Sequence, residues 1–295
     1  MKPAQFAYRD PVTVVEALNL LAEYGEDARL LAGGQSLVPM LNFRLVQPAV
    51  IIDLNGIEEL CNIQVAGDRF RIGSMARQAS VESHRDIIRG WPLLVDALRH
   101  VAHPPIRNRG TIGGSLAHND PAAELPAVMV ALGTRMILQS AREQRTVPAE
   151  FFFVSPLETA LAPDELLVAI EAPVPNPSAG WGFAEISRRH GDFALAAAAV
   201  QLIPGETGRA PGARIVVTGV AERPLRVSEA ENILCEGAWS AVRDKAIRAA
   251  VETAVEPFED LHAPGWYRQQ AAGVMAARAC QDALMRGADL AARHD

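Results

Sequence analysis

Two glycine pairs are the residues of this chain whose type and spacing most clearly suggest ligand chemistry. Gly33 and Gly34 stand in LLAGGQSLVPMLNFRL, between an apolar run and a helical pattern. Glycine tolerates positive φ and lets the backbone approach a ligand closely. Exposed amides that lead into a helix N-terminus bind anions without a lysine. The amides of residues 33–37 are therefore predicted to bind a phosphate or a pyrophosphate.

A second glycine pair repeats the pattern in RGTIGGSLAHNDPAAELP, where Gly113 and Gly114 are followed by Ser115. Thr111 adds a hydroxyl to this segment. Two amide-rich loops from separate subdomains would grip a diphosphate between them, as a dinucleotide requires. Glu124 is then a candidate carboxylate for the ribose hydroxyls. Either glycine pair alone is explained as well by a simple strand-to-helix turn as by an anion site. The two pairs together favour the anion site.

The sequence lacks the signatures of several other enzyme classes. It contains no GxGxxG, GxxxxGK[ST], HExxH or GxSxG, so a Rossmann nicotinamide site, a nucleotide triphosphatase, a zincin and an α/β-hydrolase are all disfavoured. The only lysines are Lys2 and Lys245, which argues against Schiff-base chemistry. His100 and His103 lie three residues apart without an evident third ligand, so no metal site is predicted.

Composition indicates an ordinary globular protein. The chain has 295 residues, 49% of them hydrophobic and 21% charged, a length that favours two domains. A net charge of -7 without a basic stripe disfavours nucleic acid as a partner. Neither a membrane span nor a signal peptide is expected. Cys61, Cys235 and Cys280 form no CxxC, so no iron–sulfur cluster is predicted in this chain, and a cytoplasmic location fits.

Local patterns predict the elements that position the first glycine pair. A helix over 13–24 is expected, because Thr13 and Glu16 form a capping box and Gly25 follows. A strand over 28–31, a helix over 37–44 with Ser36 as N-cap, and a buried strand over 49–54 complete a β-turn-α-β unit. Such units bind ligands at the carboxyl ends of their strands.

The remaining patterns predict a larger second block and a C-terminal domain. A helix over 121–132 is expected to begin with Asp120 as N-cap and to end at Gly133. The Pro-rich stretch 172–180 marks the predicted domain boundary. The other expected strands are 64–66, 69–73, 135–138, 166–171, 182–186, 194–202 and 213–220, and the other expected helices are 80–88, 91–102, 228–234, 241–255 and 266–285.

Two segments resemble a known family closely. AGGQSLVPMLNFRL and RNRGTIGGSLAHNDPAAELPA are similar to the two flavin-binding segments of the FAD subunits of molybdenum hydroxylases. These are the medium subunits of the carbon monoxide dehydrogenase, xanthine dehydrogenase and quinoline oxidoreductase type. The resemblance extends to MKPAQFAYRDP, VIIDLNGI and SRRHGDFALAAAAV, and so covers nearly the whole chain.

The resemblance implies an α+β fold with three parts. Residues 1–175 would form an FAD-binding domain of the vanillyl-alcohol-oxidase or p-cresol-methylhydroxylase type. Its two subdomains would cover about 1–57 and 58–175. Residues 178–295 would form the small α+β C-terminal domain of this flavoprotein subunit.

The resemblance also implies cofactor contacts. The loop Ala32–Leu37 (Ala32, Gly33, Gly34, Gln35, Ser36 and Leu37) would wrap the FAD diphosphate. Glu124 would bind the adenosine ribose, where relatives often have an aspartate, and Phe193 would neighbour the isoalloxazine ring. Asp120 is a further candidate, although a helix N-cap is its simpler interpretation. The other implied contacts are Thr111, Ile112, Gly113, Gly114 and Ser115 at the diphosphate and flavin, His118 near the ribityl chain, and Leu167 beside the adenine or flavin.

The resemblance finally implies an electron-transfer subunit with no catalytic residue of its own for substrate hydroxylation. FAD would be held noncovalently and would pass electrons from [2Fe–2S] clusters of a small partner subunit to an external acceptor. A large partner would hold the molybdopterin cofactor, and the assembly would be a dimer of heterotrimers. Two alternatives remain open: a free-standing FAD-dependent oxidoreductase with its own substrate pocket, and a non-catalytic nucleotide-binding scaffold.

Overall fold

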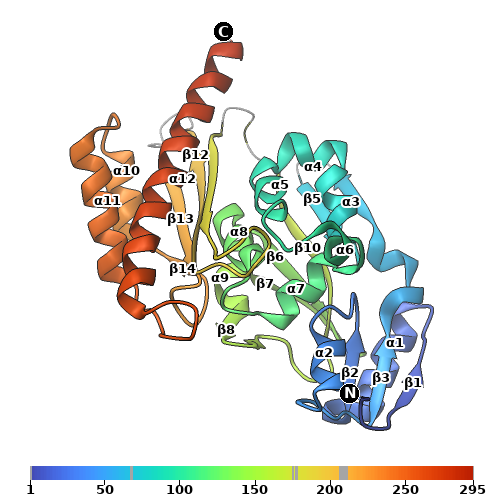
Figure 1. Cartoon of the computed structure of the whole chain (residues 1–295). Helices are drawn as coiled ribbons and strands as arrows, with labels where there is room; N and C mark the ends of the chain where they lie inside the picture. Colours follow the sequence, from blue (N-terminus) through green and yellow to red (C-terminus); the bar gives the residue numbers. More distant parts are fainter. Residues whose placement is uncertain (1, 67–68, 175, 177–178, 206–211, 295) are drawn as a thin grey trace. The chain divides into compact units, whose positions relative to one another are not determined.

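The computed structural model describes residues 2–66, 69–174, 176, 179–205 and 212–294 (Figure 1). The chain forms two compact units, each assembled from three segments. Both units combine helices with sheets, so the predicted α+β class is confirmed. Unit 1 is Met1–Val81, His103–His118 and Thr134–Pro173, and unit 2 is Glu82–Ala102, Asn119–Gly133 and Val174–Asp295.

Unit 1 begins with a three-stranded parallel sheet in the order β1-β3-β2 (β1, Ala7–Arg9; β2, Ala28–Leu31; β3, Val50–Asp53). Helix α2 (Leu37–Asn42) connects β2 to β3, which confirms the predicted β-turn-α-β unit. The sheet is drawn in blue in Figure 1, together with α1. The carboxyl end of β2 therefore delivers the first glycine pair to the start of α2.

Helix α1 (Val14–Tyr24) forms as predicted from its caps. The Thr13 hydroxyl accepts a hydrogen bond from the Glu16 amide at 3.2 Å, and Gly25 ends the helix with φ 51°. The Glu16 carboxylate accepts a bond from the Val12 amide at 2.8 Å, one residue earlier than in a standard capping box. The apolar face of α1, which includes Leu18, packs into the core that β3 shares with β10 (Leu166–Pro173).

The second part of unit 1 is an antiparallel sheet of five strands in the order β4-β5-β10-β6-β7. The strands expected over 64–66 and 69–73 pair antiparallel, and residues 67–68 between them lie outside the described residues. The remaining strands of the unit are β4 (Ile63–Ala66), β5 (Arg69–Gly73), β6 (Arg135–Gln139), β7 (Gln144–Pro148), β8 (Phe153–Ser155) and β9 (Glu158–Thr159). Its remaining helices are α3 (Gln78–Ser83, which runs past the end of the segment), α6 (Pro104–Arg109), α7 (Ile112–His118), α9 (Ala149–Phe152) and the short 3-10 turns Gly25–Asp27, Leu54–Gly56 and Glu58–Cys61.

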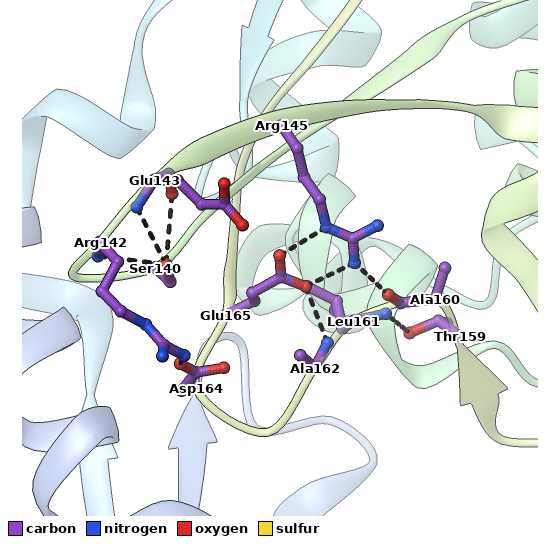
Figure 2. Close-up of polar contacts among 10 residues, drawn as sticks. All are labelled: Ser140, Arg142, Glu143, Arg145, Thr159, Ala160, Leu161, Ala162, Asp164 and Glu165. Atoms are coloured by element: carbon purple, nitrogen blue, oxygen red, sulfur yellow. Dashed lines mark hydrogen bonds and ion pairs between the residues drawn. The ribbon is translucent and has the colours of Figure 1, made fainter.

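A charged cluster fixes the loop that leads into β10 (Figure 2). Arg145 on β7 donates to both carboxylate oxygens of Glu165, at 2.6 and 2.7 Å, and to the Ala160 carbonyl at 2.6 Å. Glu165 also accepts a bond from the Ala162 amide at 2.8 Å. The Arg145 guanidinium holds the pKa of Glu165 below its usual range. This bidentate pair anchors the start of β10, the strand that carries Leu167.

Unit 2 contains an antiparallel sheet in the order β11-β12-β13-β14, covered by the long helix α12 (Gly265–His294). Figure 1 shows α12 lying along β11 and β12. Glycine allows this close packing, because a Cβ on Gly182 would lie 1.9 Å from the Ala279 carbonyl oxygen. The strands are β11 (Trp181–Ile186), β12 (Ala196–Ile203), β13 (Gly212–Thr218) and β14 (Leu225–Arg226), and the other helices are α4 (Arg85–Gly90), α5 (Pro92–Leu98), α8 (Glu124–Leu132), α10 (Ser228–Cys235) and α11 (Ala241–Ala254).

Several predicted helices differ from the structure in their bounds. The helix expected over 80–88 is broken at His84, whose extended backbone (φ -73°, ψ 122°) separates α3 from α4. The helix expected over 91–102 ends at Leu98, and α12 runs beyond the expected 266–285. Residues 175 and 177–178 of the predicted boundary stretch lie outside the described residues. In the described part of the chain, no helix is long and apolar enough to cross a bilayer.

Candidate functional site

The first glycine segment, Ala32–Leu37, leaves β2 and enters α2 with most of its amides unused. Gly34 has φ +75°, which is the conformation that glycine favours and other residues avoid. No described residue accepts a hydrogen bond from the five amides of residues 33–37. The Gln35 side chain bonds to the Gly33 carbonyl at 2.9 Å, and the Gly34 carbonyl accepts from Val38 at 3.1 Å. The local backbone thus presents donors to an anion.

Ser36 is not the side-chain cap that the sequence predicts for α2. The structure shows no hydrogen bond from its hydroxyl to the helix, and its backbone is already in the right-handed helical region (φ -102°, ψ -47°). The 34–38 turn, closed by the Gly34 carbonyl, starts the helix instead. The Ser36 hydroxyl therefore has no role in capping α2.

The second glycine segment does not repeat the first. Ile112, Gly113, Gly114 and Ser115 lie inside α7, not in a loop before it. Their amides are bonded within the protein: Gly113 donates to the Ser74 carbonyl at 2.8 Å, and Ser115 to the Thr111 carbonyl at 3.2 Å. Ile112 donates to the Ala76 carbonyl at 3.0 Å. Any contribution of this segment to ligand binding must come from other atoms than these amides.

Thr111 caps α7 through its side chain. Its hydroxyl accepts a hydrogen bond from the Gly114 amide at 3.0 Å, and the residue is 2% exposed. We expect Thr111→Val, which is nearly isosteric, to lower the free energy of unfolding by about 1 kcal/mol because the Gly114 amide loses its acceptor. Denaturant unfolding measures the loss. Thr111→Ser keeps the oxygen and is the matched control; equal destabilisation by serine and valine would contradict this explanation.

The glycines also let the two segments touch. A Cβ on Gly33 would lie 2.4 Å from the Arg109 carbonyl oxygen and 2.8 Å from Gly110 Cα. A Cβ on Gly114 would lie 2.6 Å from the Thr111 hydroxyl and 3.3 Å from Ala32 Cβ. Contacts this close leave no room for a side chain at either glycine. The spacing of the two glycine pairs in the sequence thus reflects packing between the segments as well as access for a ligand.

Two further candidates of unit 1 lie in regular elements. His118 is in the last turn of α7 and is half-buried. Leu167 is 3% exposed on β10, next to an irregularity in the pairing with β6 between Leu167 and Ala169. Leu166 and Val168 on either side of it belong to the core. The Leu167 side chain is thus buried in unit 1.

Unit 2 holds the remaining candidates, Asp120, Glu124 and Phe193. Asp120 is not the N-cap of α8, because that helix begins only at Glu124. The Asp120 carboxylate accepts from the Ala122 amide at 2.9 Å in a turn that precedes the helix. The end of β13 fixes this turn, since Thr218 donates its hydroxyl proton to the Pro121 carbonyl at 3.0 Å. Gly133 ends α8 in the left-handed conformation, as predicted.

Glu124 is a buried carboxyl at the first position of α8. It is 4% exposed, and burial raises its pKa to about 7, with a smaller contribution of the same sign from Asp120. A helix N-terminus favours a negative charge, and burial opposes it. Phe193, in contrast, is 61% exposed in the turn before β12. A buried carboxyl and an exposed aromatic ring are suitable contacts for ribose hydroxyls and for a flat ring, respectively.

Sequence reasoning missed three polar residues that the structure makes prominent. Asn55 and Arg77 are hydrogen-bonded to each other at 2.5 Å beside the glycine segments of unit 1. Glu185 on β11 of unit 2 has a side chain that is only 2% exposed. Two signals were available in the sequence: polar residues directly follow the buried strand in VIIDLN, and a glutamate interrupts the apolar strand WGFAEI.

Comparison with protein families assigns both halves of the chain. Residues 4–175 match the family described as the FAD binding domain in molybdopterin dehydrogenase. Residues 181–283 match the family described as the CO dehydrogenase flavoprotein C-terminal domain. Together the two matches extend over most of the sequence, and the first contains both glycine segments.

Curated relatives and solved structures agree with this assignment. The chain is 40% identical to the 6-hydroxypseudooxynicotine dehydrogenase complex subunit alpha of Paenarthrobacter nicotinovorans, over 97% of both chains. It is 44% identical to the caffeine dehydrogenase subunit beta of a Pseudomonas strain, over 79% of both. A chain of carbon monoxide dehydrogenase from Hydrogenophaga pseudoflava superposes with a TM-score of 0.92 at 38% identity, covering 97% of this chain and 99% of that one.

Quinoline 2-oxidoreductase from Pseudomonas putida 86 contains a similar chain, with a TM-score of 0.89 at 35% identity. That match covers 97% of this chain and 99% of the other. The family match, the length of the shared sequence and the unused amides of the first glycine segment all agree. The chain belongs to the FAD-binding medium subunits of molybdenum hydroxylases of the carbon monoxide dehydrogenase and quinoline oxidoreductase type, and it is an oxidoreductase subunit.

Proposed function

We propose that this chain is the electron-transfer subunit of a heterotrimeric molybdenum-containing hydroxylase or dehydrogenase. The residues of this chain would hold FAD, which would supply the redox chemistry between [2Fe–2S] clusters of a small partner subunit and an external acceptor. The large partner would hold the molybdopterin cofactor and perform the hydroxylation. The single observation that carries the proposal is the first glycine segment, whose five amides have no acceptor among the described residues.

Within this proposal, the residues of the chain hold and orient a noncovalent FAD. The amides of Ala32–Leu37 donate to the diphosphate, as unpaired amides before a helix do for anions. Glu124 binds the adenosine ribose, and Phe193 packs beside the isoalloxazine ring. The further contacts that we propose are Thr111, Ile112, Gly113, Gly114, Ser115, His118, Asp120 and Leu167. The helical placement of residues 112–115 means that they contribute through side chains and surface, not through their amides.

The domain assignment is part of the proposal. We place an FAD-binding domain of the vanillyl-alcohol-oxidase or p-cresol-methylhydroxylase type at 1–175, with subdomains of about 1–57 and 58–175. The C-terminal flavoprotein domain then covers 178–295. The two family matches, over 4–175 and 181–283, support these limits. We also propose a cytoplasmic location, which the three free cysteines support.

Substrate choice, in this proposal, belongs to the large partner. The relatives of this chain are named for different substrates, among them caffeine, carbon monoxide and a nicotine derivative, at similar levels of identity of 44%, 37% and 40%. A subunit that contacted the substrate would vary with it. The similar chains of carbon monoxide dehydrogenase and quinoline 2-oxidoreductase, two enzymes with different substrates, instead share one fold with this chain, which fits a shared task of electron transfer.

Mild affinity purification of this chain from its native cells tests the proposed assembly. We expect two partner chains to co-purify, with a flavin absorption spectrum and with iron and molybdenum in the eluate. We expect the mass of the purified complex to correspond to a dimer of heterotrimers. A single yellow protein without metals would instead support a free-standing flavoprotein. A colourless chain would support a nucleotide-binding scaffold.

A further inference from the structure

A side-chain amide links the first glycine segment to the strand beside it. Asn55 follows β3, in the turn Leu54–Gly56, and its Nδ2 donates to the Ala32 carbonyl at 3.0 Å. Its own amide donates to the Asp53 carboxylate at 2.9 Å, which fixes the turn. Asn55 thus holds the first residue of the segment Ala32–Leu37 by its carbonyl, and leaves the amides that follow untouched.

Arg77 extends this link to the second glycine segment. Its Nη2 donates to Asn55 Oδ1 at 2.5 Å, and its Nη1 donates to the Arg109 carbonyl. The backbone of Arg77 also forms an isolated antiparallel bridge with Thr111. One planar guanidinium therefore contacts both Asn55 and the residue that enters the second segment, an arrangement that needs the fixed fork of donors that only arginine has.

The Asn55–Arg77 pair carries the polar connection between the segments. No hydrogen bond between described residues joins 32–37 directly to 109–115. The two meet instead through backbone contact, since a Cβ on Gly33 would lie 2.4 Å from the Arg109 carbonyl oxygen. Arg77 donates to that same carbonyl oxygen. The pair therefore sets how closely the backbone of the first segment approaches the second.

The charge of Arg77 adds a second effect. Its described hydrogen-bond acceptors are a carbonyl and an amide oxygen, and no carboxylate among the described residues forms an ion pair with it. The Asp53 carboxylate on this link bonds to Asn55 and not to Arg77, so the guanidinium has no direct ionic partner among the described residues. In a chain with two lysines, neither near this site in sequence, that charge attracts an anion to the adjacent amides.

We propose that Asn55 and Arg77 act together as positioning residues, which hold the glycine segments 32–37 and 109–115 at the separation that the FAD diphosphate requires. The inference rests on the proposed role of Ala32–Leu37 in binding that diphosphate. Neither residue needs to touch the flavin. Their effect is on the conformation of the free amides, so they should act as one unit on FAD affinity.

A double-mutant cycle on FAD affinity tests this unit. The full-length chain is stripped of flavin and titrated with FAD, and separately with ADP, which carries the diphosphate without the flavin. We expect Arg77→Gln to weaken both ligands on the order of tenfold, because a charge-assisted contact is lost, and Asn55→Ala to weaken them by a comparable factor. The double variant should bind FAD and ADP no less tightly than the single variant with the lower affinity, because either change breaks the same link.

Two further variants separate positioning from charge and from general stability. Arg77→Lys keeps the charge but cannot reach both acceptors, so it should recover only part of the FAD affinity that Arg77→Gln loses. Arg71→Gln removes an arginine of the same unit, paired with Glu171 on the neighbouring strand, and should leave FAD affinity unchanged. FAD affinity is compared at a temperature where thermal unfolding shows every flavin-free variant to be fully folded, so a lower affinity there does not reflect a loss of folding.

The binding measurements distinguish a failure of this inference from a failure of the proposed FAD-binding function. A wild-type chain that binds neither FAD nor ADP would refute the cofactor role itself. Normal binding by the wild type with additive losses in the cycle would refute the shared action of Asn55 and Arg77 alone. Full FAD affinity in Arg77→Lys would also overturn the inference, because charge without geometry would then suffice.

Discussion

Gly34→Val is expected to give a folded chain that retains no FAD. Gly34 has φ +75°, and a Cβ there would lie 3.2 Å from Val38 Cγ2 and 3.3 Å from Leu31 Cδ1. A left-handed backbone costs an L-residue about 1–2 kcal/mol, and β-branching makes it worse. The segment should escape this strain by changing conformation, and the amides of 33–37 would then no longer converge. Flavin content per chain, measured by absorbance after purification, is the readout.

Gly25→Val is the matched control for that variant. Gly25 also has positive φ, +51°, but no atom of the described residues lies within 4 Å of its Cβ position, and Gly25 ends α1 instead of leading into α2. Both substitutions therefore place a β-branched residue at a positive φ in the same unit. We expect the control to lose some thermal stability and to keep its flavin. A Gly34→Val protein with normal flavin content would show that the diphosphate does not bind at this segment.

The sequence predicts unit 1 best where the signals are local. The cap at Thr13, the stop at Gly25 and the apolar runs of β2 and β3 lie within a few residues of the elements that they define. Short-range signals of this kind act in the same way whatever the rest of the chain does. The β-turn-α-β unit and its glycine loop could therefore be predicted with nearly the bounds that the structure shows.

Long-range contacts decide the features that sequence patterns misplace. The pattern NDPAAEL predicts a capped helix that begins at Pro121. In the structure, the Thr218 hydroxyl at the end of β13 is bonded to the carbonyls of Pro121 and Ala123. Helix α8 therefore begins only at Glu124. Gly113 and Gly114 look like an anion loop, but the Ser74 carbonyl and the Thr111 hydroxyl already accept their amide protons. These partners are distant in sequence or offer no pattern of their own, so only the folded structure reveals them.

In the candidate site, too, local features could be predicted from the sequence and long-range contacts could not. The unused amides of 33–37 follow from a local glycine pattern, and the sequence singles them out. The bridge from Ala32 through Asn55 and Arg77 to Arg109 joins four places in the chain, and no spacing rule connects them. Resemblance to a family could identify the cofactor. It could not show which side chains hold the glycine segments together.

Unit 2 contains a carboxyl whose burial should be visible in the pH dependence of stability. The Glu185 side chain is 2% exposed, and its Oε1 lies 3.9 Å from His100 Nδ1. Its Oε2 has no hydrogen-bond partner among the described residues. Burial, followed by the charge of Glu124, raises the pKa of Glu185 to about 8. Burial and the neighbouring His190 lower the pKa of His100, against a smaller opposing effect of Asp96. His100 therefore carries less positive charge at neutral pH than an ordinary histidine and offers little compensation for a charge on Glu185.

The sign of the effect follows from proton uptake. Between the usual pKa range of a glutamate and pH 8, the folded chain holds a proton on Glu185 that the unfolded chain has released. Folding then takes up a proton, so this group costs stability progressively as the pH rises through that window, and the cost is constant above it. At about 1.4 kcal/mol per unit of pKa difference, the full cost is a few kcal/mol.

Glu185→Gln should therefore stabilise the chain at high pH and change little at low pH. The glutamine amide is neutral at every pH, so its folding takes up no proton at this position. We expect the unfolding temperature of the variant to exceed that of the wild type by roughly 5 °C or more at pH 8.5, and the two to converge near pH 5. Glu229 is at an exposed position of the same unit, and the unfolding temperature of Glu229→Gln should follow that of the wild type at every pH. Parallel curves for Glu185→Gln and the wild type would mean that Glu185 is already ionised at neutral pH, with a compensating charge close to it.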